Sequence, residues 1–313
     1  MAVMTRFTAA QVPDQTGRLI VITGANSGTG FEAARVLAAK GAEVVIAARN
    51  AVKAEEAMAH ILRETPSARL RFEALDLSRQ ASVRAAAERL NAQGRPVDVL
   101  INNAGVMALP TRQVSEDGFE LQLATNYLGH FALTGLILPL LKAGRARTVQ
   151  LSSIAHRQGR IHLDDLQVEA YRPWKAYAQS KLAMLMFALE LDRRSRANGW
   201  GLTSVAAHPG YARTALIENG PLVGSSAGRA FHRAVFRPLI EPLISHSAAD
   251  GALPILMAAT APDIRPGGYY GATRLRELKG PAGEVGMKPW ARDEGVAGAL
   301  WERSEALTGV RFG

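Results

Sequence analysis

The sequence predicts an α/β fold built on a doubly wound parallel sheet with helices on both faces. Short apolar runs alternate with longer segments of helical composition along most of the chain, which is typical of βαβ units. The apolar runs are nearly continuous, as expected of strands that helices cover on both sides. A glycine-rich turn joins the first apolar run to the first helical segment.

The expected elements follow one another in a regular order. Strands are expected at residues 19–22, 42–48, 70–77, 97–102, 147–152, 202–207 and 267–271. Helices are expected at residues 31–40, 51–64, 81–91, 116–141, 174–196, 247–260 and 293–307. We expect a single domain made of an N-terminal arm (1–17), a cofactor-binding and catalytic core (18–210), a substrate lid (211–245) and a C-terminal tail rich in Gly and Pro (272–313).

The composition restricts the class of protein. The chain has 313 residues, of which 48% are hydrophobic and 21% are charged, as in ordinary soluble globular domains. The absence of cysteine excludes disulfides, thiolate catalysis and cysteine-ligated metals, and it fits a reducing compartment, so a cytoplasmic location is expected. No apolar stretch is long enough to span a membrane, and the first 18 residues contain no run typical of a signal peptide.

The charge pattern argues against a nucleic-acid partner. The formal net charge is +9, from 37 basic and 28 acidic residues. These charges are scattered and form no block of Lys or Arg, whereas a small anionic ligand needs only a local basic patch. The seven histidines show no metal-ligand spacing, so no metal site is expected.

The glycine-rich turn predicts a dinucleotide site. Gly24, Gly28 and Gly30 lie between an apolar run and a helical segment, which is the context in which such glycines bind a pyrophosphate. A Cβ would keep the backbone away from the anion, and the first N–H groups of the helix are free to hold it. The alternative is a strand-to-helix turn that is glycine-rich and binds nothing.

A second pattern carries acid–base chemistry. Tyr177 and Lys181 are four residues apart in a predicted helix, so they lie on the same face. A phenol has a pKa near 10, and a neighbouring ammonium is expected to lower it. Tyr177 would then act as a general acid or base. Taken alone, this pair can also arise by chance on a helix surface.

Three polar residues fall close to the same place in the predicted fold. Ser152 and Ser153 end the fifth strand, and residues at the carboxyl ends of strands face the ligand site of such sheets. Asn126 lies inside an otherwise apolar helical segment, where a buried amide needs hydrogen-bond partners. We expect Asn126 to hold backbone and water in place.

Taken together, these motifs resemble the short-chain dehydrogenase/reductase family over roughly residues 17–270. The motifs that carry the resemblance are Thr23-Gly24-x-x-x-Gly28-x-Gly30, Asn102-Asn103-Ala104-Gly105, Asn126, Ser153, Tyr177-x-x-x-Lys181 and Pro209-Gly210. The resemblance implies a single-domain Rossmann-like fold and hydride transfer between a nicotinamide and a carbonyl or alcohol. It also implies a catalytic tetrad of Asn126, Ser153, Tyr177 and Lys181, with Ser153 preferred over Ser152.

The resemblance implies a role for each member of that tetrad. Ser153 and Tyr177 hydrogen-bond the substrate oxygen, and Tyr177 gives or takes its proton. Lys181 binds the ribose and lowers the pKa of Tyr177, while Asn126 orders a water that links Lys181 to solvent. The cofactor-binding residues that it implies are Gly24, Asn26, Ser27, Gly28, Thr29, Gly30, Arg49, Asn50, Asp76, Leu77, Asn103, Ala104, Gly105, Tyr177, Lys181, Pro209, Gly210 and Thr214.

The residues at the end of the second strand and just after it indicate NADP(H) as the cofactor. An NAD-specific site places a carboxylate there, which binds the ribose hydroxyls and repels a 2′-phosphate. This sequence has Ala48 in that place, followed by Arg49, with Lys53 one turn further on. A guanidinium binds phosphate through charge-assisted, bidentate hydrogen bonds. The alternative is that Arg49 is a solvated surface residue and both cofactors bind equally.

The length of the segment between Ser153 and Tyr177 indicates which branch of the family the sequence resembles. These residues are 24 positions apart, where many family members have about a dozen. The insert at 160–166 and the N-terminal residues 13–17 resemble the retinol-dehydrogenase-like branch, which implies a bulky apolar substrate. The alternative is that the insert is only a longer surface loop. Trp174 can line the substrate pocket or serve packing alone.

Other functions and assemblies stay open at this stage. A cofactor-binding sensor or scaffold without catalysis would not require Ser153, Tyr177 and Lys181. The basic, apolar segment 229–244 resembles an interfacial membrane helix, but Pro238 and Pro242 interrupt its periodicity and favour a substrate lid. Because the helices at 116–141 and 174–196 often pair between subunits in the family, a homodimer or homotetramer is expected.

Overall fold

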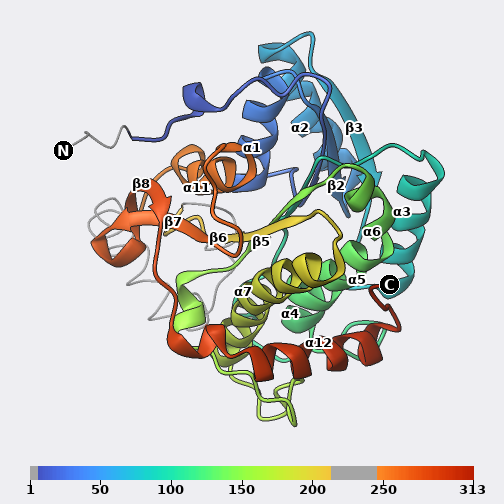
Figure 1. The fold of residues 1–313 in the computed structure, drawn as a ribbon, viewed down its shortest axis with the longest axis vertical. Helices are drawn as coiled ribbons and strands as arrows, with labels where there is room; N and C mark the ends of the chain where they lie inside the picture. The colour runs from blue at the N-terminus through green and yellow to red at the C-terminus, as the bar shows by residue number, and fades with distance from the viewer. Residues whose placement is uncertain (1–5, 213–244) are drawn as a thin grey trace.

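The computed structural model describes residues 6–212 and 245–313, and within them the predicted doubly wound sheet is confirmed. The described strands form one eight-stranded sheet in the order β3-β2-β1-β4-β5-β6-β7-β8 (Figure 1). The strands β1 to β7 pair in parallel. Their bounds are β1 Leu19–Thr23, β2 Glu43–Ala48, β3 Arg69–Ala74, β4 Val99–Asn102, β5 Arg147–Leu151, β6 Thr203–Ala207, β7 Tyr269–Arg274 and β8 Lys279–Glu284.

Helices cover both faces of this sheet (Figure 1). One face carries α1, α2 and α11, and the other carries α3, α5, α7 and α12. Alternate residues of β1 enter the two cores, with Leu19 and Val21 on one side and Ile20 and Ile22 on the other. The described helices are α1 Gly28–Ala39, α2 Ala51–Glu64, α3 Gln80–Ala92, α4 Leu121–Leu123, α5 Gly129–Leu136, α6 Leu138–Ala143, α7 Pro173–Asn198, α11 Ala248–Thr260 and α12 Glu294–Thr308.

The single helix predicted at 116–141 is wrong at its beginning. The helical segment starts at Leu121, because the Glu120 carboxylate accepts the N–H groups of Gln122 and Leu123 at 3.0 and 2.7 Å and so caps the first turn. The preceding residues make a tight turn instead, in which Val114 and Glu120 form an isolated antiparallel bridge.

The same segment is also interrupted twice. Residues Ala124–Leu128 form a π-helical turn that contains Asn126, and such turns are frequent at functional sites. The helix then breaks at Ile137, where α5 gives way to α6. Pro139 stands in the first turn of α6, where a missing N–H costs nothing, but the same residue cannot continue the ladder of α5.

The C-terminal part differs most from the prediction. The tail expected at 272–313 contains β8, which pairs antiparallel with β7 and closes the sheet at that edge. The predicted last helix is present as α12, which lies alongside α7 and α5 (Figure 1). No residue of α7 from 176 to 195 is exposed, and none of α5 is. The face through which the resemblance implied subunit pairing is therefore covered by the chain itself.

Part of the predicted lid lies outside the described residues. Residues 213–244, which include Thr214 and the segment 229–244, are among those not described. The residues that flank them meet, since Ala212 and His246 form an isolated parallel bridge. In the parts of the chain that are described, no helix is long and apolar enough to cross a membrane.

Candidate active site

The carboxyl ends of the parallel strands bring the predicted site residues to one edge of the sheet. The strand order reverses between β1 and β4, and ligands of such sheets bind in the crevice at that point. The glycine turn follows β1, and residues 103–105 follow β4. Ser153 comes after β5, and Pro209 comes after β6. The loops after β1 and β4 are in direct contact with each other.

The glycines of the turn are required by their surroundings. Gly24 has a φ of +67°, and a Cβ there would lie 2.9 Å from the Cα of Ala104. A Cβ on Gly30 would lie 2.4 Å from Nδ2 of Asn103 and 2.8 Å from the carbonyl oxygen of Gly24. The first turn of α1 therefore packs directly on the loop after β4. Because Gly24 and Gly30 carry no Cβ, the backbone of this turn stays accessible to a pyrophosphate.

Thr23 connects these two loops, a role that the sequence analysis missed. Its Oγ1 accepts the N–H groups of Asn103 and Ala104 at 2.9 and 3.0 Å. The Asn103 amide donates to the Thr23 carbonyl oxygen at 2.9 Å and accepts from the Thr29 hydroxyl at 3.2 Å. The position of Thr23 just before the first glycine was visible in the sequence, but its contacts 80 residues away were not.

His130 continues this chain of hydrogen bonds towards Asn126. Its Nε2 lies 2.8 Å from Oγ1 of Thr23, and its Nδ1 lies 3.0 Å from the backbone oxygen of Asn126. Because a carbonyl only accepts, Nδ1 carries the proton and Nε2 accepts from Thr23. Burial lowers the pKa of His130 to about 3, so the ring is neutral. No role for His130 was expected from the sequence, beyond the absence of metal-ligand spacing among the histidines.

Asn126 holds the backbone at the end of the β4 loop, as expected. Its Oδ1 accepts the N–H of Val106 at 2.7 Å, and its Nδ2 donates to the Val106 oxygen and to Oγ of Ser180, both at 2.9 Å. A Cβ on Gly105 would lie 3.0 Å from this Oδ1 and 3.2 Å from Nζ of Lys181. The expected water between Asn126 and Lys181 stays a prediction.

Tyr177 and Lys181 lie on the same face of α7, next to the end of β5. The Lys181 Nζ lies 5.9 Å from the centre of the Tyr177 ring and donates to the Leu151 oxygen at 3.0 Å. Both side chains are buried. Burial lowers the pKa of Lys181 to about 8, since desolvation disfavours the charged form.

The pKa of Tyr177 moves in the direction opposite to the one expected. Burial raises it, and a hydrogen bond with the Ser153 side chain opposes that rise. The ammonium of Lys181 is bound to the Leu151 oxygen, and the desolvation of the phenol outweighs any help from it. Tyr177 is therefore a neutral phenol at neutral pH, which is the form that donates a proton.

The two serines after β5 have different partners. The Ser152 hydroxyl is buried and donates to the Lys181 backbone oxygen at 2.7 Å. The Ser153 side chain accepts the N–H of Ala155 at 3.2 Å, which caps the 3-10 turn Ile154–Gln158, and it lies close enough to Tyr177 to oppose the rise in the pKa of the phenol. This arrangement favours Ser153 as the hydroxyl that faces a substrate.

The predicted adenosine end lies at the ends of β2 and β3. Ala48 is the last residue of β2, so Arg49 projects from the same edge as the glycine turn. Arg49 is exposed and has no hydrogen bond or ion pair with any residue that the structure describes. Asn50 caps α2 by accepting the N–H of Lys53 at 3.0 Å.

Asp76 and Leu77 complete this end of the site. The Asp76 carboxylate accepts both the N–H and the hydroxyl of Ser78, at 3.0 and 2.6 Å. The side chain of Leu77 is buried, and a Cβ on Gly129 would lie 2.3 Å from the Leu77 oxygen. The loop after β3 is therefore fixed against α5.

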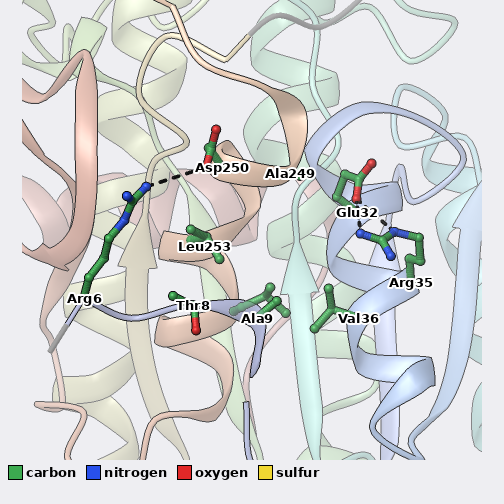
Figure 2. A pocket seen from close by; sticks show the side chains of 10 residues that line it. Arg6, Thr8, Ala9, Glu32, Arg35, Val36, Ala249, Asp250 and Leu253 are labelled. Atoms are coloured by element: carbon green, nitrogen blue, oxygen red, sulfur yellow. Dashed lines mark hydrogen bonds and ion pairs between the residues drawn. The ribbon is translucent and has the colours of Figure 1, made fainter. Parts of the chain in front are cut away.

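A pocket of about 300 Å³ lies elsewhere, between the N-terminal arm, α1 and α11 (Figure 2). Arg6 and Asp250 approach to 3.9 Å on one side of it, and Glu32 pairs with Arg35 on the other. None of the predicted catalytic or cofactor-binding residues that the structure describes lines this pocket. The pocket is therefore separate from the candidate active site at the carboxyl edge of the sheet.

The sequence is similar to a family model and to named relatives over most of its length. The family model for short chain dehydrogenases matches residues 18–220. Human retinol dehydrogenase 12 is 38% identical, with 97% of this chain and 90% of the relative covered. Polyprenol dehydrogenase of Mus musculus is 39% identical, with 98% of this chain and 88% of the relative covered.

A structural comparison extends the similarity to the whole fold. A solved structure of an uncharacterised protein from Mycobacterium paratuberculosis is 40% identical and has a TM-score of 0.79. The match covers 99% of this chain and 100% of that one. With the glycine turn, the β4 loop and the Ser153–Tyr177–Lys181 group assembled at one edge of the sheet, the chain belongs to the short chain dehydrogenase family of oxidoreductases.

Proposed function

We propose that this protein is an NADP(H)-dependent oxidoreductase that interconverts a carbonyl and an alcohol on a bulky apolar substrate. The observation that carries the proposal is the convergence of a neutral, buried phenol, a buried ammonium and a hydroxyl at the ligand edge of the sheet. The Ser153 side chain lies close enough to Tyr177 to act on the pKa of the phenol, and Lys181 lies one helical turn away on the same face.

Each of these residues has a distinct task in carbonyl reduction. NADPH, when bound, supplies the hydride to the carbonyl carbon. The hydroxyls of Ser153 and Tyr177 bind and orient the substrate oxygen, and Tyr177 donates the proton that this oxygen needs as it becomes an alcohol. The charge of Lys181 stabilises the phenolate that Tyr177 leaves behind. Asn126 holds the neighbouring loop through Val106.

The choice of NADP(H) rests on the end of β2. Ala48 offers no carboxylate to bind ribose hydroxyls or to repel a phosphate. Arg49 is exposed at the edge where the adenosine ribose would lie, and it has no partner among the described residues. The glycine cradle, in which added Cβ atoms at Gly24 and Gly30 would clash, fits a pyrophosphate.

The substrate class rests on Trp174 and on the two named relatives. Trp174 begins the face of α7 that carries Tyr177, and their rings meet edge to face with 5.9 Å between centroids. Although it is a large apolar side chain, Trp174 is 47% exposed, so it offers an apolar surface beside the reacting oxygen. Retinol and polyprenols are both isoprenoid alcohols, and we extend that class to this chain.

Turnover with a panel of substrates tests the proposal. We expect NADPH oxidation with retinal and with long-chain isoprenoid aldehydes, and much less with acetaldehyde. NADH should support the same reaction at least about tenfold less efficiently in kcat/KM, as the charge-assisted bonds to a phosphate require. Tight NADPH binding without turnover of any carbonyl or alcohol would favour the alternative, a cofactor-binding sensor or scaffold.

The cellular location of the protein is a further expectation that can be tested. A cytoplasmic location stays a prediction from composition. Co-sedimentation with liposomes tests the alternative of a membrane-surface enzyme, which depended on residues 229–244.

A further inference from the structure

The connection between β7 and β8 has an unusual backbone. Leu275, Arg276 and Glu277 all have positive φ values, of 49°, 56° and 72°. None of them is glycine, and residues with a Cβ adopt this conformation only when their surroundings hold them in it. The surroundings of Glu277 are therefore informative.

Glu277 bridges two segments that come from different strands. Its Oε1 lies 2.5 Å from Nη2 of Arg157, and its Oε2 lies 3.2 Å from Nε2 of His208. The Glu277 side chain is only 13% exposed, and His208 is fully buried. His208 Nδ1 accepts the N–H of Gly210 at 3.1 Å, so Nε2 carries the proton and lies beside the carboxylate, in contact with it but outside hydrogen-bond geometry.

Arg157 belongs to the turn that Ser153 caps. The 3-10 turn Ile154–Gln158 follows Ser153 directly. Besides its ion pair with Glu277, Arg157 donates to the Arg276 oxygen at 3.4 Å. The Ser153 carbonyl is held in addition by Nδ1 of His156 at 2.7 Å. The connection between β7 and β8 thus holds the loop that carries Ser153 in place through Arg157.

The same connection also contacts the turn after β6. The N–H of Tyr211 donates to the Leu278 oxygen at 2.8 Å. A Cβ on Gly210 would lie 2.7 Å from that oxygen, and a Cβ on Gly271 would lie 1.9 Å from Nε2 of His208. Both glycines are therefore needed for the hairpin and the His208 ring to fit against this turn.

We propose that Glu277 is a positioning residue that fixes the Ser153 turn relative to the Pro209–Gly210 turn. The inference rests on the proposed function. One carboxylate, anchored in a strained connection, ties the loop that binds the substrate oxygen to a loop of the cofactor site. Without its negative charge, the Arg157 guanidinium loses its partner and the hairpin loses its anchor, so the two loops move independently.

The test compares Glu277, in the connection between β7 and β8, with Glu284, the last residue of β8. Glu277→Gln keeps the shape of the side chain but removes the charge. Glu284→Gln is the matched control, because its pair with Arg265 at 2.5 Å is largely exposed. We expect Glu277→Gln to lower kcat for carbonyl reduction by roughly tenfold or more, since small misplacements of reacting groups are costly. The dissociation constant of NADPH should change less than about threefold, because the substitution does not touch the proposed cofactor-binding residues in the glycine turn after β1 and at Arg49 after β2. Glu284→Gln should leave both values unchanged.

A second pair of variants keeps the inference open to refutation. Arg157→Gln should reproduce the loss in kcat, and the double variant should lose little more than either single one, since both remove the same tie. Unchanged kcat in Glu277→Gln, or losses that multiply in the double variant, would overturn the inference while leaving the proposed function intact. Absence of turnover by the unmodified protein would overturn the proposed function and this inference with it.

Discussion

Burial acts on Tyr177 and Lys181 in opposite directions and thereby prepares both for proton transfer. It raises the pKa of the phenol and lowers the pKa of the ammonium to about 8, because desolvation favours the neutral form of each. At neutral pH the phenol still has its proton, and Lys181 is still mostly charged. The pair is therefore suited to donating a proton and stabilising the phenolate that results.

This arrangement predicts a pH dependence of carbonyl reduction. Above a pH of about 8 Lys181 loses its proton, and the phenolate that forms on Tyr177 loses its stabilising charge. The kcat/KM for reduction should fall with an apparent pKa near 8. In Lys181→Arg the side chain keeps its charge, so the fall should move to higher pH in a variant whose melting temperature shows that it is folded. A fall at the same pH in that variant would assign the titration to another group.

The residues after β2 predict a reversal of cofactor preference. Ala48→Asp with Arg49→Ala introduces a carboxylate and removes the guanidinium, so kcat/KM should favour NADH over NADPH. Arg63→Ala, which removes an exposed arginine from the far end of α2, is the control and should keep the original preference. Equal use of both cofactors by the unmodified protein at low salt would show that Arg49 does not bind the phosphate.

At the residue scale, local patterns were predictable and distant contacts were not. The spacing of Tyr177 and Lys181 is a property of one helix, so the sequence alone places them on one face. The contacts of Thr23 with Asn103 and of Glu277 with Arg157 span 80 and 120 positions. No pattern within a single element indicates such pairs.

Elements built on a regular period were predicted well, and irregular ones were not. The strands β1, β2 and β4 are apolar over most of their length, and β1 to β6 lie close to where they were expected. The segment 116–141 is apolar over most of its length, so its pattern does not reveal the π-helical turn or the break before Pro139. The strand β8, Lys279–Glu284, contains two glycines and a proline, which predict a loop.

The helix α12 should contribute strongly to stability. Trp301 is fully buried, and its ring lies 5.1 Å from Phe131, 5.7 Å from Phe187 and 4.4 Å from Phe312 between centroids. Trp301→Ala should therefore lower the free energy of unfolding by about 3–5 kcal/mol in urea denaturation. Val52→Ala, at an exposed site on α2, should change it by about 0.5 kcal/mol or less. Similar values for the two variants would show that α12 packs only loosely.

At the scale of the whole molecule, the chain itself covers most of the helices through which the resemblance implied subunit pairing. The helix α12 packs against α7 and α5, where no residue of α5 and none of α7 from 176 to 195 is exposed, and β8 extends the sheet beyond β7 (Figure 1). A helix that is buried all round within one chain has no apolar face left for a partner. The homodimer or homotetramer expected from the sequence stays a prediction, and it would need a surface other than this one. Light scattering tests it, and a mass of 33.5 kDa, that of one chain, would contradict it.

We propose that the buried phenol of Tyr177 donates its proton beside a bound nicotinamide cofactor. The most direct measurement is NADPH-dependent reduction of retinal by Tyr177→Phe, with NADPH binding measured on the same sample. This variant removes one oxygen from a buried ring and leaves Ser153 and Lys181 in place. We expect turnover to be lost while the dissociation constant of NADPH changes little, and near-normal turnover would show that Tyr177 is not the proton donor.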